Sequence, residues 1–357
     1  MNRQVFLDPS WYSEAGPDDD VVISTRVRLA RNLAGLSFPD RMNESELTEL
    51  RIRIVPLIAD VLAKPLFRHI DIATARSDEL TFLIERNLYP RDMSGRSPLM
   101  LCVRNDQKIT ALVNGIDHIH VTGFRTGLRA QEALAEVRGI EEQLDTVLRF
   151  AVDMNFGFLT SEISSCGTGM RCGTLVHLPG LTESDSLQNV FTKVQASGFR
   201  VKRFASSTDD SLGSVYQISD GGQFGKSEET VIRELEAVVG EVVQSERESR
   251  VARLEQDGSL FRSQVYEAQQ MLQTVQTLDT EAALKTVLWL RAGAATGLIE
   301  GTNVEDFTSL LFEVQKNHIL RVMESAKSGG SGSSGGVSGI TDSMVAAHRA
   351  DMVRRVL

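Results

Sequence analysis

Two short arginine-containing segments of this sequence carry side chains suited to binding phosphate groups. In VVISTRVRLARN, which begins at Val21, Arg26 and Arg28 are two residues apart, so an extended backbone places both guanidinium groups on one side. The planar guanidinium fork matches the oxygen atoms of adjacent phosphates. In GTGMR, glycines that permit close backbone approach to a ligand precede Arg171. Taken alone, the first segment is more typical of a solvated basic edge strand, and the second is a weak signal.

The elements that must position these arginines indicate an α+β fold. Helical spacing of apolar residues predicts a helix over 46–62, which Pro56 should kink or break. Short β-rich runs punctuated by Gly, Asn and Asp follow over 78–121 and 157–219, and a helix over 129–150 separates them. The expected core is therefore a sheet flanked by helices.

The last third of the sequence is predicted to be mainly helical. Ser227 is a suitable N-cap for a long helix, because Glu228 and Glu229 follow in its first turn. Three further helical stretches are expected over 262–277, 280–296 and 303–325. The chain then divides into five parts. A mainly helical N-terminal part that includes the first arginine segment spans 1–77, and a sheet core spans 78–256. A helical region (257–326), a Gly/Ser-rich linker (327–339) and a final helix (340–357) follow.

Composition excludes several classes of function. The 357-residue chain has a formal net charge of -10, which argues against general nucleic-acid binding because neutralising phosphates needs a basic surface. No apolar run reaches the roughly 18 residues of a membrane span, and the polar start of the chain favours a cytoplasmic protein. Cys102, Cys166 and Cys172 lack metal-ligand spacing, so they are expected to be reduced thiols. No protein-bound metal cluster is predicted.

Several segments, taken together and in order, resemble the phosphagen kinase superfamily, the ATP:guanidino phosphotransferases. The resemblance is nearest to the bacterial protein arginine kinases, which phosphorylate arginines on proteins. It covers most of the chain from about Val21 to Leu311. The segments that carry it are STRVRLARNL at Ser24, NGIDHIHV at Asn114, GFLTSEISSCGTGMRCGTLVHLPGL at Gly157, SLGSVYQIS at Ser211, KSEETVIRELEAVVGEVVQSER at Lys226 and LDTEAALKTVLWLRAGAATGLIEG at Leu278.

The resemblance implies an antiparallel sheet flanked by helices, the catalytic fold shared with glutamine synthetase-like enzymes, with ATP and Mg²⁺ bound across it. On this basis Arg26, Arg28 and Arg171 match the phosphate-binding arginines of the family. His120 stands where another phosphate arginine is usual, and its charge near neutral pH is conditional. In the mobile loop of the family, VKRFASS replaces a pattern close to VRGxxGE, and Lys202 or Arg203 is a candidate phosphate contact.

The departures from the family pattern fall on the groups that handle the substrate guanidinium. A carboxylate must orient that group and accept charge or a proton from it. NGIDHIH replaces NEEDHxR, so Gly115 and Ile116 stand where two glutamates are usual. Glu162 occupies the position of the family cysteine that contacts the guanidinium, and Ser207 that of the second carboxylate. Family histidines near the nucleotide base correspond to Asn87 and Leu175.

Three hypotheses follow. The preferred one is a degenerate regulatory or scaffolding homologue, a pseudokinase that still binds nucleotide. The second is an active enzyme with relocated carboxylates, supplied by Glu162, Asp117, Asp209 or Asp210, although a solvated Glu162 and an acidic turn are the more ordinary interpretation. The third is a structural dimerisation protein without a ligand. Family resemblance suggests a homodimer and, as partners, a companion arginine kinase or adaptor and a stress-response protease system.

Two local features allow further expectations. Asn114 and Gly115 are compatible with a type I′ hairpin turn, whereas the family register turns near Asn105 and Asp106 and continues the strand through Asn114; we favour the family register. Near the C-terminus, the RDxxRA segment that the bacterial branch uses for phosphoarginine corresponds to VAAHRA from Val345. It keeps only Arg349 and the alanine after it.

Overall fold

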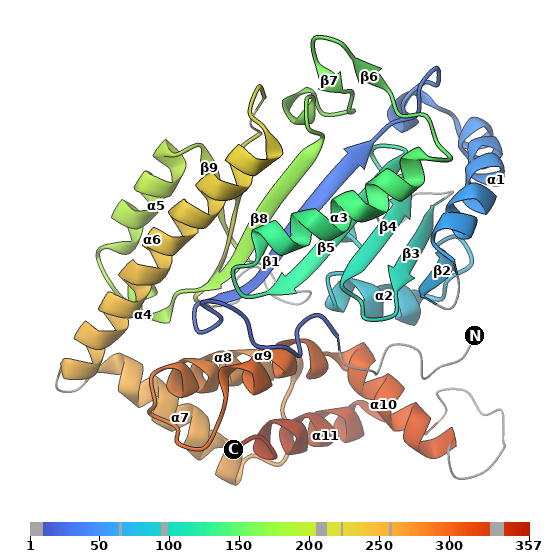
Figure 1. The fold of residues 1–357 in the computed structure, drawn as a ribbon. Coiled ribbons are helices and arrows are strands. Elements are labelled where there is room, and N and C mark those ends of the chain that lie inside the picture. Colours follow the sequence, from blue (N-terminus) through green and yellow to red (C-terminus); the bar gives the residue numbers. More distant parts are fainter. Residues whose placement is uncertain are drawn as a thin grey trace.

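The computed structural model describes residues 10–63, 66–93, 99–204, 213–222, 224–256, 259–328 and 339–357. Its centre is an eight-stranded sheet in the order β2-β3-β4-β5-β1-β8-β10-β9, in which every neighbouring pair is antiparallel (Figure 1). The predicted antiparallel α+β fold is confirmed. The strands are β1 Val22–Arg31, β2 Phe67–Asp71, β3 Met100–Arg104, β4 Ile109–Val113, β5 Ile119–Thr126, β8 Met170–His177, β9 Phe199–Arg203 and β10 Val215–Asp220, and a hairpin of β6 Val152–Asp153 and β7 Gly157–Phe158 lies apart from them.

The first arginine segment forms a central strand of this sheet. β1 pairs with β5 on one side and β8 on the other. Val27 and Leu29 are fully buried on one face, and the alternation of a strand turns Arg26 and Arg28 to the opposite face. A solvated edge strand, the ordinary interpretation of this segment, is therefore wrong. The domain boundaries stay a prediction, but β1 is continuous with strands of the expected core.

Helices cover the face that carries Val27 and Leu29. α3 (Ala130–Asp145) packs across β1 and β5, and α6 (Glu228–Glu255) covers β8 and β10 (Figure 1). α3 lies so close to the sheet that a Cβ atom on Gly123 would be 2.7 Å from the side chain of Val137, so only glycine fits there. The Ser227 side chain accepts a hydrogen bond from the backbone N–H of Thr230, which confirms the predicted N-cap of α6.

The first long helix differs from its prediction at one residue. α1 (Glu44–Val61) runs without interruption through Pro56, so the expected break is wrong. Proline removes the hydrogen bond to the carbonyl of Ile52, but Pro56 and Ile52 both lie on the exposed side of the helix, where water replaces the lost donor. A capping box of Asn43 and Glu46 starts this helix.

The register favoured for this region is right at its first turn and wrong at Asn114. β4 ends at Val113, and Asn114 has a left-handed φ of 60° at the start of a turn closed by its N–H and the carbonyl of His118, 2.9 Å apart. The turn at Asn105 and Asp106 exists as well, so β3, β4 and β5 form two successive hairpins. The β-rich expectation also fails locally, because α2 (Ser77–Glu85), the short α4 (Pro179–Thr182) and α5 (Leu187–Ala196) occupy parts of those ranges.

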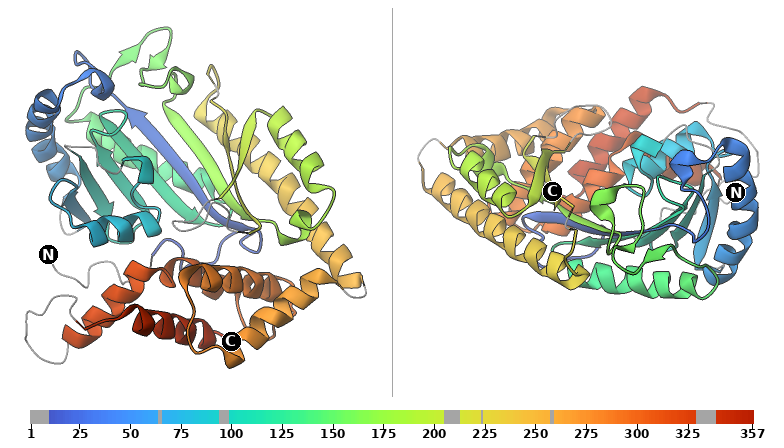
Figure 2. Two further views of the ribbon diagram at one scale, coloured as in Figure 1. Left: turned by 180° about the vertical axis from the view of Figure 1, so that it is seen from behind. Right: turned by 90° about the horizontal axis from the view of Figure 1, so that it is seen from above.

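The C-terminal third forms a helical layer across one end of the strands, as Figures 1 and 2 show. The expected helix over 303–325 is two helices, and the final helix docks through buried Val345 and Val353, while Met344 stays exposed. None of the helices in the described ranges is long and apolar enough to cross a membrane. The helices of this layer are α7 Leu260–Thr274, α8 Thr280–Ala295, α9 Val304–Glu313, α10 Lys316–Ser328 and α11 Asp342–Arg354.

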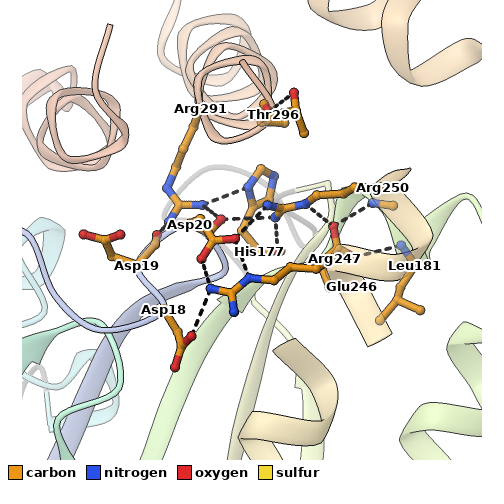
Figure 3. Close-up of polar contacts among 12 residues, drawn as sticks. Asp18, Asp19, Asp20, His177, Leu181, Glu246, Arg247, Arg250, Arg291 and Thr296 are labelled. Atoms are coloured by element: carbon orange, nitrogen blue, oxygen red, sulfur yellow. Dashed lines mark hydrogen bonds and ion pairs between the residues drawn. The ribbon is translucent and has the colours of Figure 1, made fainter. Parts of the chain in front are cut away.

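A buried network of arginines joins this helical layer to the sheet (Figure 3). Arg291 of α8 donates to the backbone carbonyls of Asp19 and Asp20, to Nδ1 of His177 at 3.1 Å and to the hydroxyl of Thr308 at 3.0 Å. Arg250 of α6 donates to the carbonyl of His177, at 3.2 Å. The loop before β1, the end of β8 and the helices α6, α8 and α9 are thus held in one arrangement.

Candidate functional site

A cavity of about 470 Å³ lies between the sheet face that carries Arg26 and Arg28 and the helical layer. Its volume is in the range of sites for small organic ligands. Arg26, Arg28 and His120 line its sheet side, and the segment after α2 contributes Asn87 and Asp92. Apolar side chains line both the sheet around these groups, with Leu112, Phe124 and Leu175, and the helical layer opposite, with Leu284, Leu288, Leu311 and Phe312. Cationic and apolar walls therefore face the same space.

The two cavity arginines have no direct acceptor for their guanidinium groups among the described residues. The Nε atom of Arg28 is buried and has no hydrogen-bond partner. Neither Arg26 nor Arg28 forms an ion pair or side-chain hydrogen bond with any other residue in the described part of the chain. Arg26 reaches water inside the cavity, but the surrounding protein and then the charge of Arg28 lower its pKa to about 10, against the opposing charge of Asp92. An anionic ligand would remove this imbalance.

Arg171 lies opposite Arg28 in the β1–β8 register but is already paired. Its Nη1 is 2.9 Å from Oδ1 of Asp220, and its Nη2 is 3.2 Å from Oε2 of Glu162 and 2.7 Å from Oγ of Ser164. Burial opposes its charge, but the two carboxylates outweigh burial and raise the pKa of Arg171. Arg171 does not line the cavity. It can bind phosphate there only if the contact with Glu162 opens.

His120 and Asp117 form a buried pair at the edge of the cavity. Nε2 of His120 is 2.9 Å from Oδ2 of Asp117, whose Oδ1 accepts hydrogen bonds from Asn32 and from the backbone N–H of Ser161, both at 2.7 Å. Burial opposes ionisation of Asp117, but these donors hold its pKa at about 2. Burial lowers the pKa of His120, so at neutral pH it is uncharged and donates from Nε2. Asp117 is thus occupied, and His120 does not replace an arginine as a cation.

The two cationic candidates of the altered loop point to opposite faces. Lys202 is opposite Gln217, a cavity residue, so cross-strand alternation places it on the cavity side of β9, although it does not line the cavity. Arg203 lies on the other side, with its guanidinium 5.7 Å from the ring centroid of Tyr216 and 3.3 Å from the tyrosine hydroxyl. Of these two, only Lys202 remains a candidate for phosphate. Ser207, Asp209 and Asp210 lie outside the described residues.

The positions that depart from the family pattern are distributed around this site. Ile116 is half-buried and packs against the apolar cluster shared with the helical layer. Asn87 and Leu175 both line the cavity. Glu162 directly precedes the short 3-10 turn η3 (Ile163–Ser165), and half of its side chain is exposed. Its only ion pair in the described part of the chain is with Arg171.

Some residues of this region were missed by the sequence analysis. Asp220 is 3% exposed and accepts hydrogen bonds from Arg171 and the backbone N–H of Cys172, which no local pattern indicates because these residues lie on different strands. The sequence also gave no indication that residues of the helical layer would line the cavity. Arg349 is buried and donates to the carbonyls of Val314 and Leu278, so it fixes α11 in place. No group of three or more potential metal ligands occurs in the described ranges.

Comparison with known proteins agrees with this fold. The sequence model of a family described as ATP:guanido phosphotransferase, C-terminal catalytic domain, matches residues 60–249, more than half of the chain. Curated relatives include the protein-arginine kinases of Bacillus cereus (strain AH187) and Bacillus anthracis. Each is 26% identical over 310 residues, which cover 85% of this chain and 87% of the relative.

Solved structures share the fold at lower sequence identity. A lombricine kinase structure is 18% identical with a TM-score of 0.56, over 68% of this chain and 72% of that chain. The duplicated taurocyamine kinase from Schistosoma mansoni, with bound transition state analog components, is 17% identical with a TM-score of 0.59. That match covers 77% of this chain and 40% of the kinase. These similarities show the fold alone.

Proposed function

Because the chain belongs to the ATP:guanido phosphotransferase family and is similar to protein-arginine kinases, we propose that it binds ATP with Mg²⁺ in the cavity but does not transfer phosphate to arginine. It is a regulatory or scaffolding member of the family, a pseudokinase. In this role it acts as a homodimer with a companion arginine kinase or adaptor and with proteins of a protease system.

The observation that carries the nucleotide part of this proposal is that the guanidinium groups of Arg26 and Arg28 have no hydrogen-bond or ion-pair partner among the described residues. Both guanidinium groups face a cavity of about 470 Å³ whose opposite wall is apolar, and the buried Nε of Arg28 has no partner. A nucleoside triphosphate supplies anionic oxygens for the arginines and a flat base for the apolar wall. When bound, Mg²⁺ would neutralise further negative charge on the phosphate oxygens, in addition to the charge that the two arginines neutralise.

The absence of transfer follows from the state of the nearby carboxylates. A guanidinium becomes a nucleophile only when a carboxylate orients it and takes up its proton or charge. Ile116 has no carboxylate, Asp117 is held by three donors at a low pKa, and Glu162 is paired with Arg171. Among the described residues, each carboxylate considered for this role is already occupied.

The proposal is tested by calorimetric titration of the purified protein with MgATP, followed by detection of phosphoarginine on an arginine-rich protein substrate in the same samples. We expect binding without transfer. The Arg28→Met variant should bind MgATP roughly 10- to 100-fold more weakly, and Arg203→Met, which changes an arginine on the opposite face of the sheet, should bind it like the wild type. Absence of MgATP binding to the folded wild-type protein would reject the proposal and favour a scaffold without a ligand.

An active enzyme with a relocated carboxylate is the second candidate, and the half-exposed Glu162 beside Arg171 favours it. If Glu162 moves away from Arg171 when phosphate arrives, it becomes available to a substrate guanidinium. Transfer by the wild-type protein that disappears in Glu162→Gln while MgATP binding persists would establish this alternative. Transfer gained only on Ile116→Glu would instead locate the loss of activity at the altered NGIDHIH segment.

A further inference from the structure

One buried acceptor on the helical-layer side of the cavity has no partner. Gln315 lies between α9 and α10, lines the cavity and is 8% exposed. Its Oε1 is buried and accepts no hydrogen bond from the described residues. A buried acceptor without a donor destabilises a fold. A ligand that donates a hydrogen bond to this oxygen would remove that cost.

The orientation of the Gln315 amide is fixed by its neighbouring helix. Its Nε2 donates to the backbone carbonyl of Leu311, in the last turn of α9, at 3.3 Å. If the amide turned over, Oε1 would point at this carbonyl and two acceptors would face each other. The part of the amide that is left for a ligand is therefore an acceptor and not a donor.

The backbone on both sides of Gln315 is held by buried contacts. Before it, the carbonyl of Val314 accepts a hydrogen bond from Nε of Arg349 at 2.7 Å. After it, the backbone N–H and the side-chain amide of Asn317 donate to the carboxylate of Glu85, at 3.2 and 2.8 Å. Residues of α2, α10 and α11 thus fix this turn, and the amide is presented to the cavity in one position.

The wall of the cavity therefore has unpaired donors and an unpaired acceptor on different elements. Arg26 and Arg28 of β1 supply donors without acceptors, and Gln315 supplies an acceptor without a donor. The side chains of Leu311 and Phe312, close to Gln315 in sequence, give the same wall an apolar surface. A ligand that matches this arrangement has an anionic group, a flat apolar ring and an N–H donor on that ring.

We propose that Gln315 accepts a hydrogen bond from the amino group at the 6-position of adenine and makes the cavity selective for adenine nucleotides. The inference rests on the proposed nucleotide binding and adds the residue that recognises the base. Adenine carries a donor at this position, whereas guanine carries an acceptor oxygen, which would face Oε1. Gln315 lies beyond residues 60–249, which the family model matches, so this recognition would come from the helical layer.

The test measures the affinity of the full chain for four ligands in the presence of Mg²⁺ by isothermal titration. The ligands are ATP, ITP, purine riboside triphosphate and tripolyphosphate. ITP has a carbonyl at the 6-position, purine riboside triphosphate has only hydrogen there, and tripolyphosphate has no base. We expect ATP to bind about fivefold more tightly than purine riboside triphosphate, as for one neutral hydrogen bond. ITP should bind more weakly than both.

The Gln315→Leu variant removes the acceptor. It should bind ATP about fivefold more weakly than the wild type, bind purine riboside triphosphate unchanged and bind ITP more tightly. A folding defect would weaken all ligands alike, so a change confined to the 6-substituent supports a direct contact. Gln315→Met, which is unbranched and of the same length, is a second variant whose folding circular dichroism checks in parallel. The control Gln244→Leu, which removes an exposed glutamine from α6, should leave all four affinities unchanged.

Three outcomes would overturn the inference. Equal binding of ATP, ITP and purine riboside triphosphate to the wild type would mean that solvent satisfies Oε1, while the proposed nucleotide binding would stand. A wild-type preference for ATP that persists in both Gln315 variants would mean that another group of the cavity recognises the base. If neither ATP nor tripolyphosphate binds to the folded wild-type protein, the proposed function fails together with this inference.

Discussion

Replacing Arg28 by methionine should increase the stability of the free protein while weakening its binding of MgATP. Methionine keeps an unbranched side chain over the inner part of arginine, but it is shorter and lacks the charge and the donors. In the free protein the Nε of Arg28 is buried without a partner, and burial lowers the pKa of Arg28, although the charges of Glu162 and Asp117 partly offset this effect. A buried unsatisfied group costs about 1–3 kcal/mol, so a gain of about 1 kcal/mol is expected after some packing is lost.

The same substitution should act with the opposite sign on the complex. A hydrogen bond between a charged donor and a phosphate oxygen contributes about 1.5–3 kcal/mol. At 1.4 kcal/mol per factor of ten, losing one such contact weakens MgATP binding roughly 10- to 100-fold. Saturating MgATP should therefore raise the melting temperature of the wild-type protein much more than that of Arg28→Met, because a ligand stabilises only the state that binds it.

Differential scanning calorimetry with and without MgATP, together with isothermal titration, measures both effects. Arg203→Met is the matched control, because Arg203 packs on the ring of Tyr216 on the other face of the sheet. It should bind MgATP like the wild type. The reasoning is refuted if Arg28→Met is less stable than the wild type and binds MgATP equally well, since Arg28 would then be a structural residue.

Three further outcomes are expected from the buried polar groups. Asp117→Asn should lower the free energy of unfolding by about 2 kcal/mol at pH 7, because the pKa of Asp117 is about 2 in the fold. This contribution is present above pH 3.8 and is lost as the pH falls through 2. Urea denaturation should therefore show a smaller difference between the variant and the wild type at pH 2 than at pH 7. Arg291→Met should loosen the helical layer, because His177 and Thr308 lose their donor, and hydrogen exchange should increase in α8 more than in α3. Burial lowers the pKa of His318 to about 3, so as the pH falls the unfolded chain takes up the proton at a higher pH than the folded protein. The free energy of unfolding should therefore fall by about 2 kcal/mol between pH 6.5 and pH 5. In His318→Asn, chemical denaturation should show a smaller decrease over the same pH range.

Local pattern was sufficient to predict the strand that carries the arginines and several helices. The alternation of Arg26 and Arg28 with Val27 and Leu29 depends only on the period of a strand, and the structure places the two arginines on one face. The N-cap at Ser227 depends on residues within one helical turn. Such features are determined by neighbours in sequence, and sequence is enough to identify them.

Other features depend on contacts that are distant in sequence. The pairing of Arg171 with Asp220 requires the register of β8 against β10, 49 residues apart in the chain. The apolar wall of the cavity requires the helical layer to fold back over the sheet, which no local pattern specifies. Pro56 was misjudged because its effect on α1 depends on whether the freed carbonyl meets water.

The contacts of two buried arginines elsewhere in the fold strengthen the case for a ligand at Arg26 and Arg28. Arg31 donates to Glu141 at 3.0 Å and to two backbone carbonyls, and Arg250 donates to Glu246 at 2.6 Å. In both cases the fold supplies acceptors that offset the loss of hydration. The described residues supply none to the guanidinium groups of Arg26 and Arg28, which lie two residues apart on the same face of β1.

This difference has an energetic consequence. If the cavity had only a structural role, the buried Nε of Arg28 would lower the stability of the fold, and an apolar side chain would fill that space better. A bound polyphosphate reverses the sign of both terms, because it pairs the orphan donor of Arg28 and separates the two positive charges by an anion. Nucleotide binding and fold stability are therefore expected to be linked in this protein even where transfer to a guanidinium is absent, and the strength of that link can be measured without any assay of catalysis.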